Sequence, residues 1–204
     1  LAVTAPMAAV GNDEIELPAT GCAVKAPPRY LPLPRGTVPV PRSMAVMTRV
    51  LLEASESPRM LDIFRLTEVE FPVGASNEER QKLLLELARK NGDEWSKQGA
   101  SEVELSVHAR PASGERIEAG TVIRMKINGL PTLAVSRWLA EKDGQVFRLA
   151  VGAPTYVPVD ELEKELDLVA ASFRRIEMPT NVPWLTSDLS LKPKKSVAEI
   201  TASA

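Results

Sequence analysis

The distribution of proline is the feature that most limits what this chain can fold into. Eight of its 17 prolines fall within residues 1–43, and others punctuate residues 178–204. Proline fixes φ, has no backbone donor and restricts the residue before it, so such stretches cannot be helical. The sequence predicts a proline-rich extended tail over 1–43, a folded domain over 44–177, and an extended tail over 178–204.

The central block carries regular patterns. Residues 44–54 and 61–71 are rich in aliphatic side chains and read as strands. Ser76 and Glu79 form a capping-box pattern that predicts a helix over 76–97, with Gly99 as its stop. Residues 103–109 alternate apolar and polar side chains, as a half-buried strand does.

Two dipeptides predict tight hairpins that join three consecutive strands. Asn128-Gly129 separates 121–127 from 132–141, and Asp143-Gly144 separates that strand from 145–151. Both dipeptides tolerate the positive φ angles of primed turns. The pattern indicates an antiparallel meander.

A last helix is expected over 159–175. It opens on a second capping-box pattern, Asp160 to Glu163, and carries a buried stripe at helical spacing. The stripe consists of Leu162, Leu166, Val169, Ala170 and Phe173. Hairpin-linked strands with separate helices indicate the α+β class.

Composition excludes several functions. The formal net charge is −2, which argues against nucleic-acid binding. No apolar run approaches the roughly 20 residues that span a bilayer. The single cysteine, Cys22, rules out an internal disulfide and a cysteine metal cage, and is interpreted as a plain small side chain. The small apolar residues from Leu1 resemble the region of a processing site, which suggests export or organelle import, or else a trimmed chain.

Catalytic chemistry is not indicated. His108 is the single histidine and lies on the polar side of its strand, which favours a solvent-facing side chain over a catalyst. The acids between Asp160 and Asp167 could bind a divalent cation, but a solvated helix face near the positive end of the dipole is favoured. Trp138 is expected in the core rather than at a docking surface. The sequence predicts no catalytic, metal or cofactor-binding residues.

The chain resembles the PsbP-like superfamily, which comprises the extrinsic oxygen-evolving-complex protein and bacterial lipoprotein relatives. The likeness is carried by Ile127–Pro131, Ser136–Trp138, Gln145–Leu149 and Ala171–Arg174, and it covers roughly residues 44–177. It implies an α/β/α sandwich around a central antiparallel sheet. The opening hairpin of the family is absent or degenerate in residues 27–43. No ion site is carried over, because His108 lies on another strand.

These observations favour a non-enzymatic accessory subunit that binds the protein subunits of a larger complex through its tails. The resemblance implies a photosynthetic complex at the thylakoid lumen. The alternative is a bacterial periplasmic module, of the lipoprotein type, that binds a ligand or partner in a groove between sheet and helix. The residues expected to contact a partner are the larger side chains between prolines: Arg29, Tyr30, Leu31, Leu33, Trp184 and Leu185.

Overall fold

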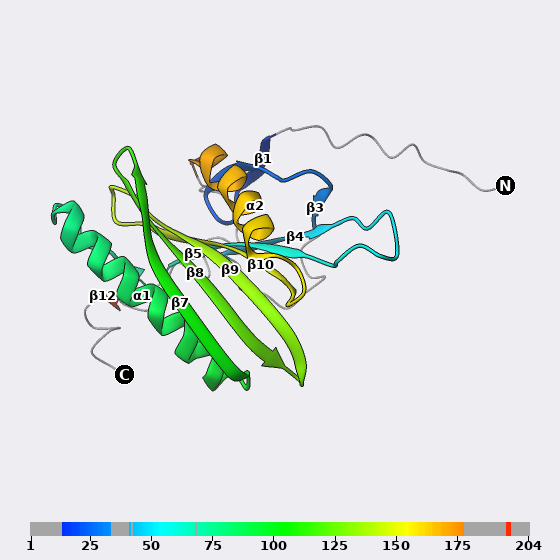
Figure 1. Ribbon diagram of the computed structural model, residues 1–204. Helices are drawn as coiled ribbons and strands as arrows, with labels where there is room; N and C mark the ends of the chain where they lie inside the picture. The colour runs from blue at the N-terminus through cyan, green and yellow to red at the C-terminus, as the bar shows by residue number, and fades with distance from the viewer. Residues whose placement is uncertain (1–13, 34–40, 42, 68, 178–194, 197–204) are drawn as a thin grey trace.

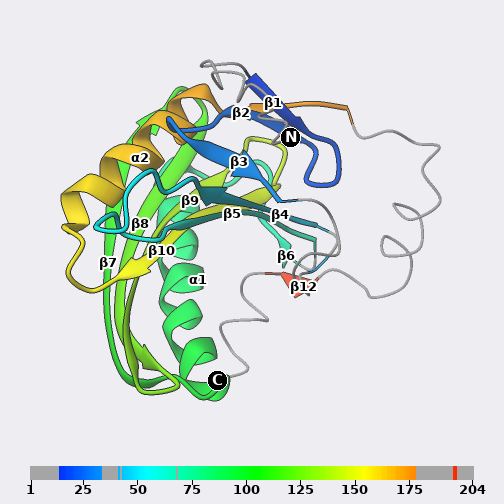
Figure 2. The same ribbon diagram turned by 90° about the vertical axis from the view of Figure 1, so that its right-hand side faces the viewer.

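The computed structural model describes residues 14–33, 41, 43–67, 69–177 and 195–196. In this part of the chain an antiparallel sheet carries one helix on each face (Figures 1 and 2). Its strands follow the order β3 (Tyr30–Pro32), β4 (Met44–Arg49), β5 (Met60–Leu66), β10 (Val146–Pro154), β9 (Leu130–Ala140), β8 (Arg116–Ile127) and β7 (Ser101–Ser113). The expected α+β sandwich is confirmed.

The meander forms as the two hairpin dipeptides predict. Asn128 and Gly129 have φ angles of 51° and 78°, which is the backbone of a primed turn between β8 and β9. Gly144 has a φ of 83°, and a Cβ there would lie 2.6 Å from the carbonyl oxygen of Phe71. Glycine is therefore required at 144 by both conformation and space.

Helix α1 (Asn77–Lys97) begins at the predicted capping box. The Ser76 hydroxyl accepts from the Glu79 amide, and the Glu79 carboxylate accepts from the Ser76 amide. Leu84, Leu87 and Ala88 are buried against β8 and β9, where Ile117, Ala119 and Trp138 complete the cluster. The core position expected for Trp138 is confirmed.

Helix α2 (Val159–Ser172) covers the opposite face, and its predicted stripe from Leu162 to Phe173 is buried. The prediction of a second capping box is wrong. The N-cap is Pro158, which has no side-chain oxygen, and Asp160 already lies inside the first turn. Two of the strand predictions were too long, because β4 ends at Arg49 and β5 ends at Leu66 before the two-residue β6 (Val69–Glu70).

The prediction of an extended tail over 1–43 is wrong for residues 14–33, because these residues belong to the domain. β1 (Glu14–Leu17) and β2 (Cys22–Lys25) form a hairpin that pairs with β11 (Arg174–Arg175), and β3 extends the main sheet. Leu17, Cys22, Val24 and Tyr30 lie in the core under α2. The prolines fall in the turns and at strand ends, where a missing donor costs little.

The tail predicted over 178–204 lies outside the described residues, except for β12 (Lys195–Ser196). This short strand pairs in parallel with β6. Residues 1–13 are outside the described part as well.

Candidate partner-binding surface

Tyr30, one of the residues expected to contact a partner, is fully buried instead. Its ring belongs to the core under α2, and its hydroxyl donates to Glu165 at 2.7 Å. Burial and the Glu165 carboxylate raise the pKa of Tyr30 well above its usual range. The expected docking role of Tyr30 is therefore corrected: the residue ties the N-terminal segment to α2.

Arg29 lies beside the long connection between β4 and β5, residues 50–59. Its guanidinium contacts Glu56 at 2.6 Å, and Glu56 also accepts from the Leu52 amide at 3.0 Å. The Arg29 carbonyl accepts from Val50. Arg29 thus holds the shape of this loop.

The other predicted contact residues divide into two groups. Leu31 and Leu33 are half-buried, and the Leu33 amide donates to Val46 at 2.8 Å. Trp184 and Leu185 lie outside the described residues, so their role stays a prediction.

Large apolar side chains are exposed at one end of the sheet. Antiparallel pairing brings the 50–59 loop, the turn at 128–129 and the β10–α2 connection (155–158) to the same end of the strands (Figures 1 and 2). We name these three connections and their flanking residues the loop end. It presents five side chains that are 43 to 70% exposed: Leu51, Leu52, Met60, Leu130 and Tyr156.

The loop end is braced by an ion-pair cluster. Arg59, at the close of the 50–59 loop, donates to Glu161 at 2.7 Å and to Glu165 of α2. Burial by itself would lower the pKa of Arg59. The hydrogen bonds and negative charges of Glu161 and Glu165 outweigh that effect and raise the pKa above its usual value. The same Glu165 binds Tyr30. The loop is therefore fixed both to α2 and to β3.

Four acids of α2 pair with arginines, although the Glu161 and Asp167 side chains stay 53% and 51% exposed. The expected solvated helix face is therefore found only in part. Glu161 and Glu165 lie on the flank that meets Arg59, whereas Glu163 and Asp167 lie on the other flank and meet Arg110 and Arg137. Within the described ranges, no group of three His, Cys, Asp or Glu side chains could hold a metal ion.

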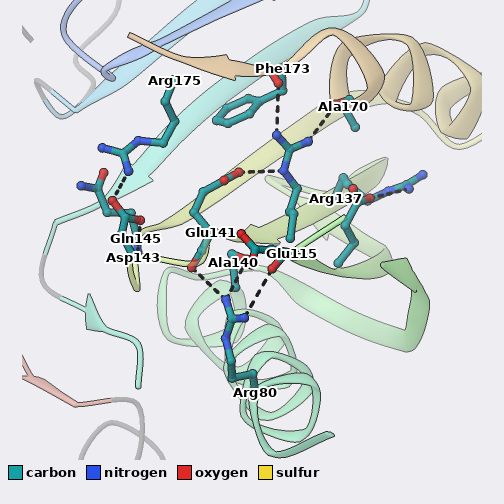
Figure 3. A network of polar contacts seen from close by, with 12 residues as sticks. Arg80, Glu115, Arg137, Ala140, Glu141, Asp143, Gln145, Ala170, Phe173 and Arg175 are labelled. Atoms are coloured by element: carbon teal, nitrogen blue, oxygen red, sulfur yellow. Dashed lines mark hydrogen bonds and ion pairs between the residues drawn. The ribbon is translucent and has the colours of Figure 1, made fainter. Parts of the chain in front are cut away.

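Two further arginines join the helices to the sheet (Figure 3). Arg80 of α1 donates to the carbonyls of Ala140 and Glu141 at 3.3 and 2.8 Å. Arg116 of β8 donates to the carbonyls of Ala170 and Phe173 at 3.2 and 3.1 Å, where the end of α2 leaves carbonyls unpaired. Sequence patterns missed these roles because each of these four carbonyls lies more than 50 residues from its arginine.

His108 is half-exposed, and its ring lies close to Gly120. Its Nε2 is 3.6 Å from Glu163, beyond hydrogen-bond range, and that carboxylate binds Arg110. Burial, and then the charge of Arg110, lower the pKa of His108. A histidine catalyst requires a nucleophile and an orienting group, each joined to it by a hydrogen bond. Among the described residues, the His108 side chain makes neither bond.

A cavity of about 290 Å³ lies at the opposite end of the sheet from the loop end. Arg65, Gln145 and Arg175 line it together with Gly21, Ile176 and Glu177. The lining contains two arginines and the acid Glu177, and Arg175 is paired with Asp143 outside it, so the lining has no clear preference for charge. No residue of α1 or α2 lines this cavity, so it does not lie between the sheet and a helix, where the ligand groove was expected.

Cys22 lies near the cavity but is wholly buried. Burial raises the pKa of its thiol to about 11. A neutral, enclosed thiol is unreactive, as a small core side chain would be.

Neither described helix is long and apolar enough to cross a membrane.

Comparison with protein-family models and with curated proteins gives no match. The fold does match solved structures. The Saccharomyces cerevisiae Ran-binding protein Mog1p superposes with a TM-score of 0.56 and 11% identity, over 82% of this chain and 96% of that one.

A point mutant of Mog1 gives a TM-score of 0.53 with 12% identity, over 82% of this chain and 97% of that one. The cyanobacterial PsbP of Synechocystis gives 0.46 with 16% identity, over 80% and 91% of the two chains. These likenesses concern the fold alone. The chain has the mixed α/β fold of Mog1.

Proposed function

We propose that this chain is a non-catalytic accessory subunit that binds another protein through its loop end. The observation that carries the proposal is the exposure of Leu51, Leu52, Met60, Leu130 and Tyr156 at one end of the sheet. Scattered single apolar residues are ordinary on a surface, whereas a group gathered on one end is typical of an interaction site.

The dimensions of the loop end suit a protein interface. It extends from β4 across β5, β10 and β9 to β8, and four strand spacings amount to about 19 Å. A standard interface covers about 800 Å² on each partner, which is a patch of comparable width. Tyr156 and Leu52 are the best anchors, because tyrosine and large apolar side chains dominate binding when a partner encloses them.

Preorganisation supports the same role. Arg29 and Glu56 fix the 50–59 loop from one side, and Arg59 fixes it to α2 from the other. Loops already held in one shape lose less entropy when a partner binds. Mog1p, which has the same fold, is described as a Ran-binding protein, so this architecture is used elsewhere to bind a protein.

The identity of the partner is a further step of the proposal. The resemblance of residues 127–131, 136–138, 145–149 and 171–174 to the PsbP-like superfamily supports a photosynthetic complex at the thylakoid lumen. The bacterial periplasm is the alternative location. Both rest on that resemblance, and the native complex that co-migrates with the chain distinguishes them.

The test compares a double variant of the loop end with a matched double variant elsewhere on the surface. Leu52→Asp with Tyr156→Ala should remove the chain from its native complex on a non-denaturing gel, without changing its melting temperature. Val73→Asp with Leu168→Asp changes equally exposed apolar residues elsewhere on the surface, and should leave incorporation intact. Full incorporation of the loop-end variant would overturn the proposal.

His108→Ala provides a separate test of the non-catalytic role. The folded variant should be incorporated as the unmodified chain is. A turnover that belongs to the native complex and disappears in this variant, with assembly intact, would contradict the absence of catalysis.

A further inference from the structure

Strand β7 forms one edge of the main sheet, and its outer side has no partner strand among the described residues (Figure 1). The opposite edge, β3, has three residues and ends on Pro32. β7 has 13 residues, so it offers a far longer row of backbone donors and acceptors. Such a row readily pairs with another strand.

The regular part of this edge is confined to its centre. β7 is irregular between Ser101 and Glu104, where Glu102 has a φ of 52°, and again between Arg110 and Ser113. Irregularities of this kind stop strand pairing. Glu104 to Arg110 remain in continuous register with β8, and Val107 lies at the middle of this run.

The two faces of the run are chemically distinct. Val103, Leu105 and Val107 face α1 and are half-buried, so part of their apolar surface is exposed at the edge. Glu104, His108 and Arg110 lie on the α2 side. Glu104 has no ion-pair partner in the described part of the chain.

We propose that β7 pairs antiparallel with β7 of a second copy of this chain, with Val107 opposite Val107. This register alone uses the whole regular run. It places Glu104 of each copy opposite Arg110 of the other, on the α2 side of the joined sheet. Opposite charges at directly opposed positions stabilise antiparallel pairs. A twofold axis repeats the contact, as in most homodimers.

This proposal concerns a different surface from the loop end and does not depend on it. The loop end lies along the ends of the strands, whereas the β7 edge runs along the side of the sheet. A homodimer joined at β7 therefore leaves both loop ends accessible.

Sedimentation equilibrium of the full chain over a range of concentrations tests the association. Dimers should form, and Glu104→Arg should raise the dissociation constant about tenfold or more, because attraction becomes repulsion at two positions. Glu53→Arg is the matched control, since Glu53 is exposed in the 50–59 loop, on the other side of the sheet from β7. A chain that stays monomeric at every concentration would overturn the proposal.

Disulfide trapping tests the register. Directly opposed residues lie about 4.5–5.5 Å apart at Cα, within the range of a disulfide, so Val107→Cys should cross-link to itself. Ala109→Cys should not, because the two copies of residue 109 would be about 13 Å apart. Cys22 is buried and gives little background. Equal cross-linking of both variants would rule out the proposed register.

Discussion

The two helices are held to opposite faces of one sheet by different interactions. α1 has 21 residues, a complete capping box and an apolar contact with β8 and β9. α2 has 14 residues and no side-chain cap, and its acids pair with Arg59, Arg110 and Arg137 along both flanks. The shorter, less well capped helix is therefore the one that depends on ion pairs and on the N-terminal strands.

The two faces differ in the sequence distance over which each helix is stabilised. α1 is stabilised by its own cap and by the hairpin-linked strands β7, β8 and β9, which follow it directly in sequence. α2 contacts β2 and is tied through Arg59 and Glu165 to residues more than 100 positions away. Changes that remove distant segments should affect the α2 face first.

Deletion of residues 1–43 should give the largest effect. It removes Leu17, Val24 and Tyr30 from the core under α2, and the cost of losing several such side chains exceeds the stability of a typical domain. This reverses the expectation drawn from the prolines, in which the rest of the chain folds alone. Chemical denaturation followed by circular dichroism should show no cooperative transition, and an unchanged melting temperature would contradict the structure.

Phe173→Ala should destabilise the domain by about 3–5 kcal/mol. Phe173 is buried at the end of α2, its ring meets Phe147 edge-on at 4.9 Å, and Arg116 lies over it. Leu168→Ala on the exposed side of α2 serves as the control and should cost less than about 0.5 kcal/mol. A loss below about 1 kcal/mol for Phe173→Ala would show that this end of α2 is not packed as described.

The ion pairs of the α2 face can be tested at Arg137 and Glu118, whose side chains are 8% and 7% exposed. Arg137→Met should cost about 3–5 kcal/mol, because Glu118 is left buried without its partner. The double variant Arg137→Met, Glu118→Leu should recover most of that loss, because neither charge remains. Urea denaturation of the single and double variants measures the difference, and equal losses would mean that burial of Glu118 is not the cause.

The smallest effect concerns pH. Since the pKa of His108 is lowered in the folded state, the unfolded chain binds the proton more readily. The contribution of His108 to stability is therefore complete above pH 6.5 and is lost as the pH falls through the lowered value. His108→Gln should weaken the decline in stability over this window. An identical decline in both proteins would assign it to other groups.

Local signals account for what the sequence predicted correctly. Ser76 and Glu79 lie three residues apart and define a helix start without any distant partner. Asn128 and Gly129 likewise carry their own turn geometry. The stripe ending at Phe173 needs only helical periodicity. The ends of elements were predicted less well, because α2 ends at Ser172 and β8 begins at Arg116, five residues before the predicted start.

Distant pairing accounts for what was missed. β1, β2 and β3 are three or four residues long and flanked by prolines, so they show little periodicity of their own. They are stabilised by β11, α2 and β4, and the β2–β11 pairing joins positions about 150 residues apart in the chain. The loop end was missed for a similar reason, because its five apolar residues come from separate connections that only the folded sheet brings to one end.

The close approach of His108 to Gly120 has an evolutionary consequence. A Cβ at position 120 would lie 2.4 Å from Nε2 of the histidine, so the ring would have to swing away. The two positions should therefore covary among relatives of this chain. Sequences with alanine or a larger residue at 120 should carry a smaller or more flexible side chain at 108, whereas those with glycine at 120 are free to keep histidine there.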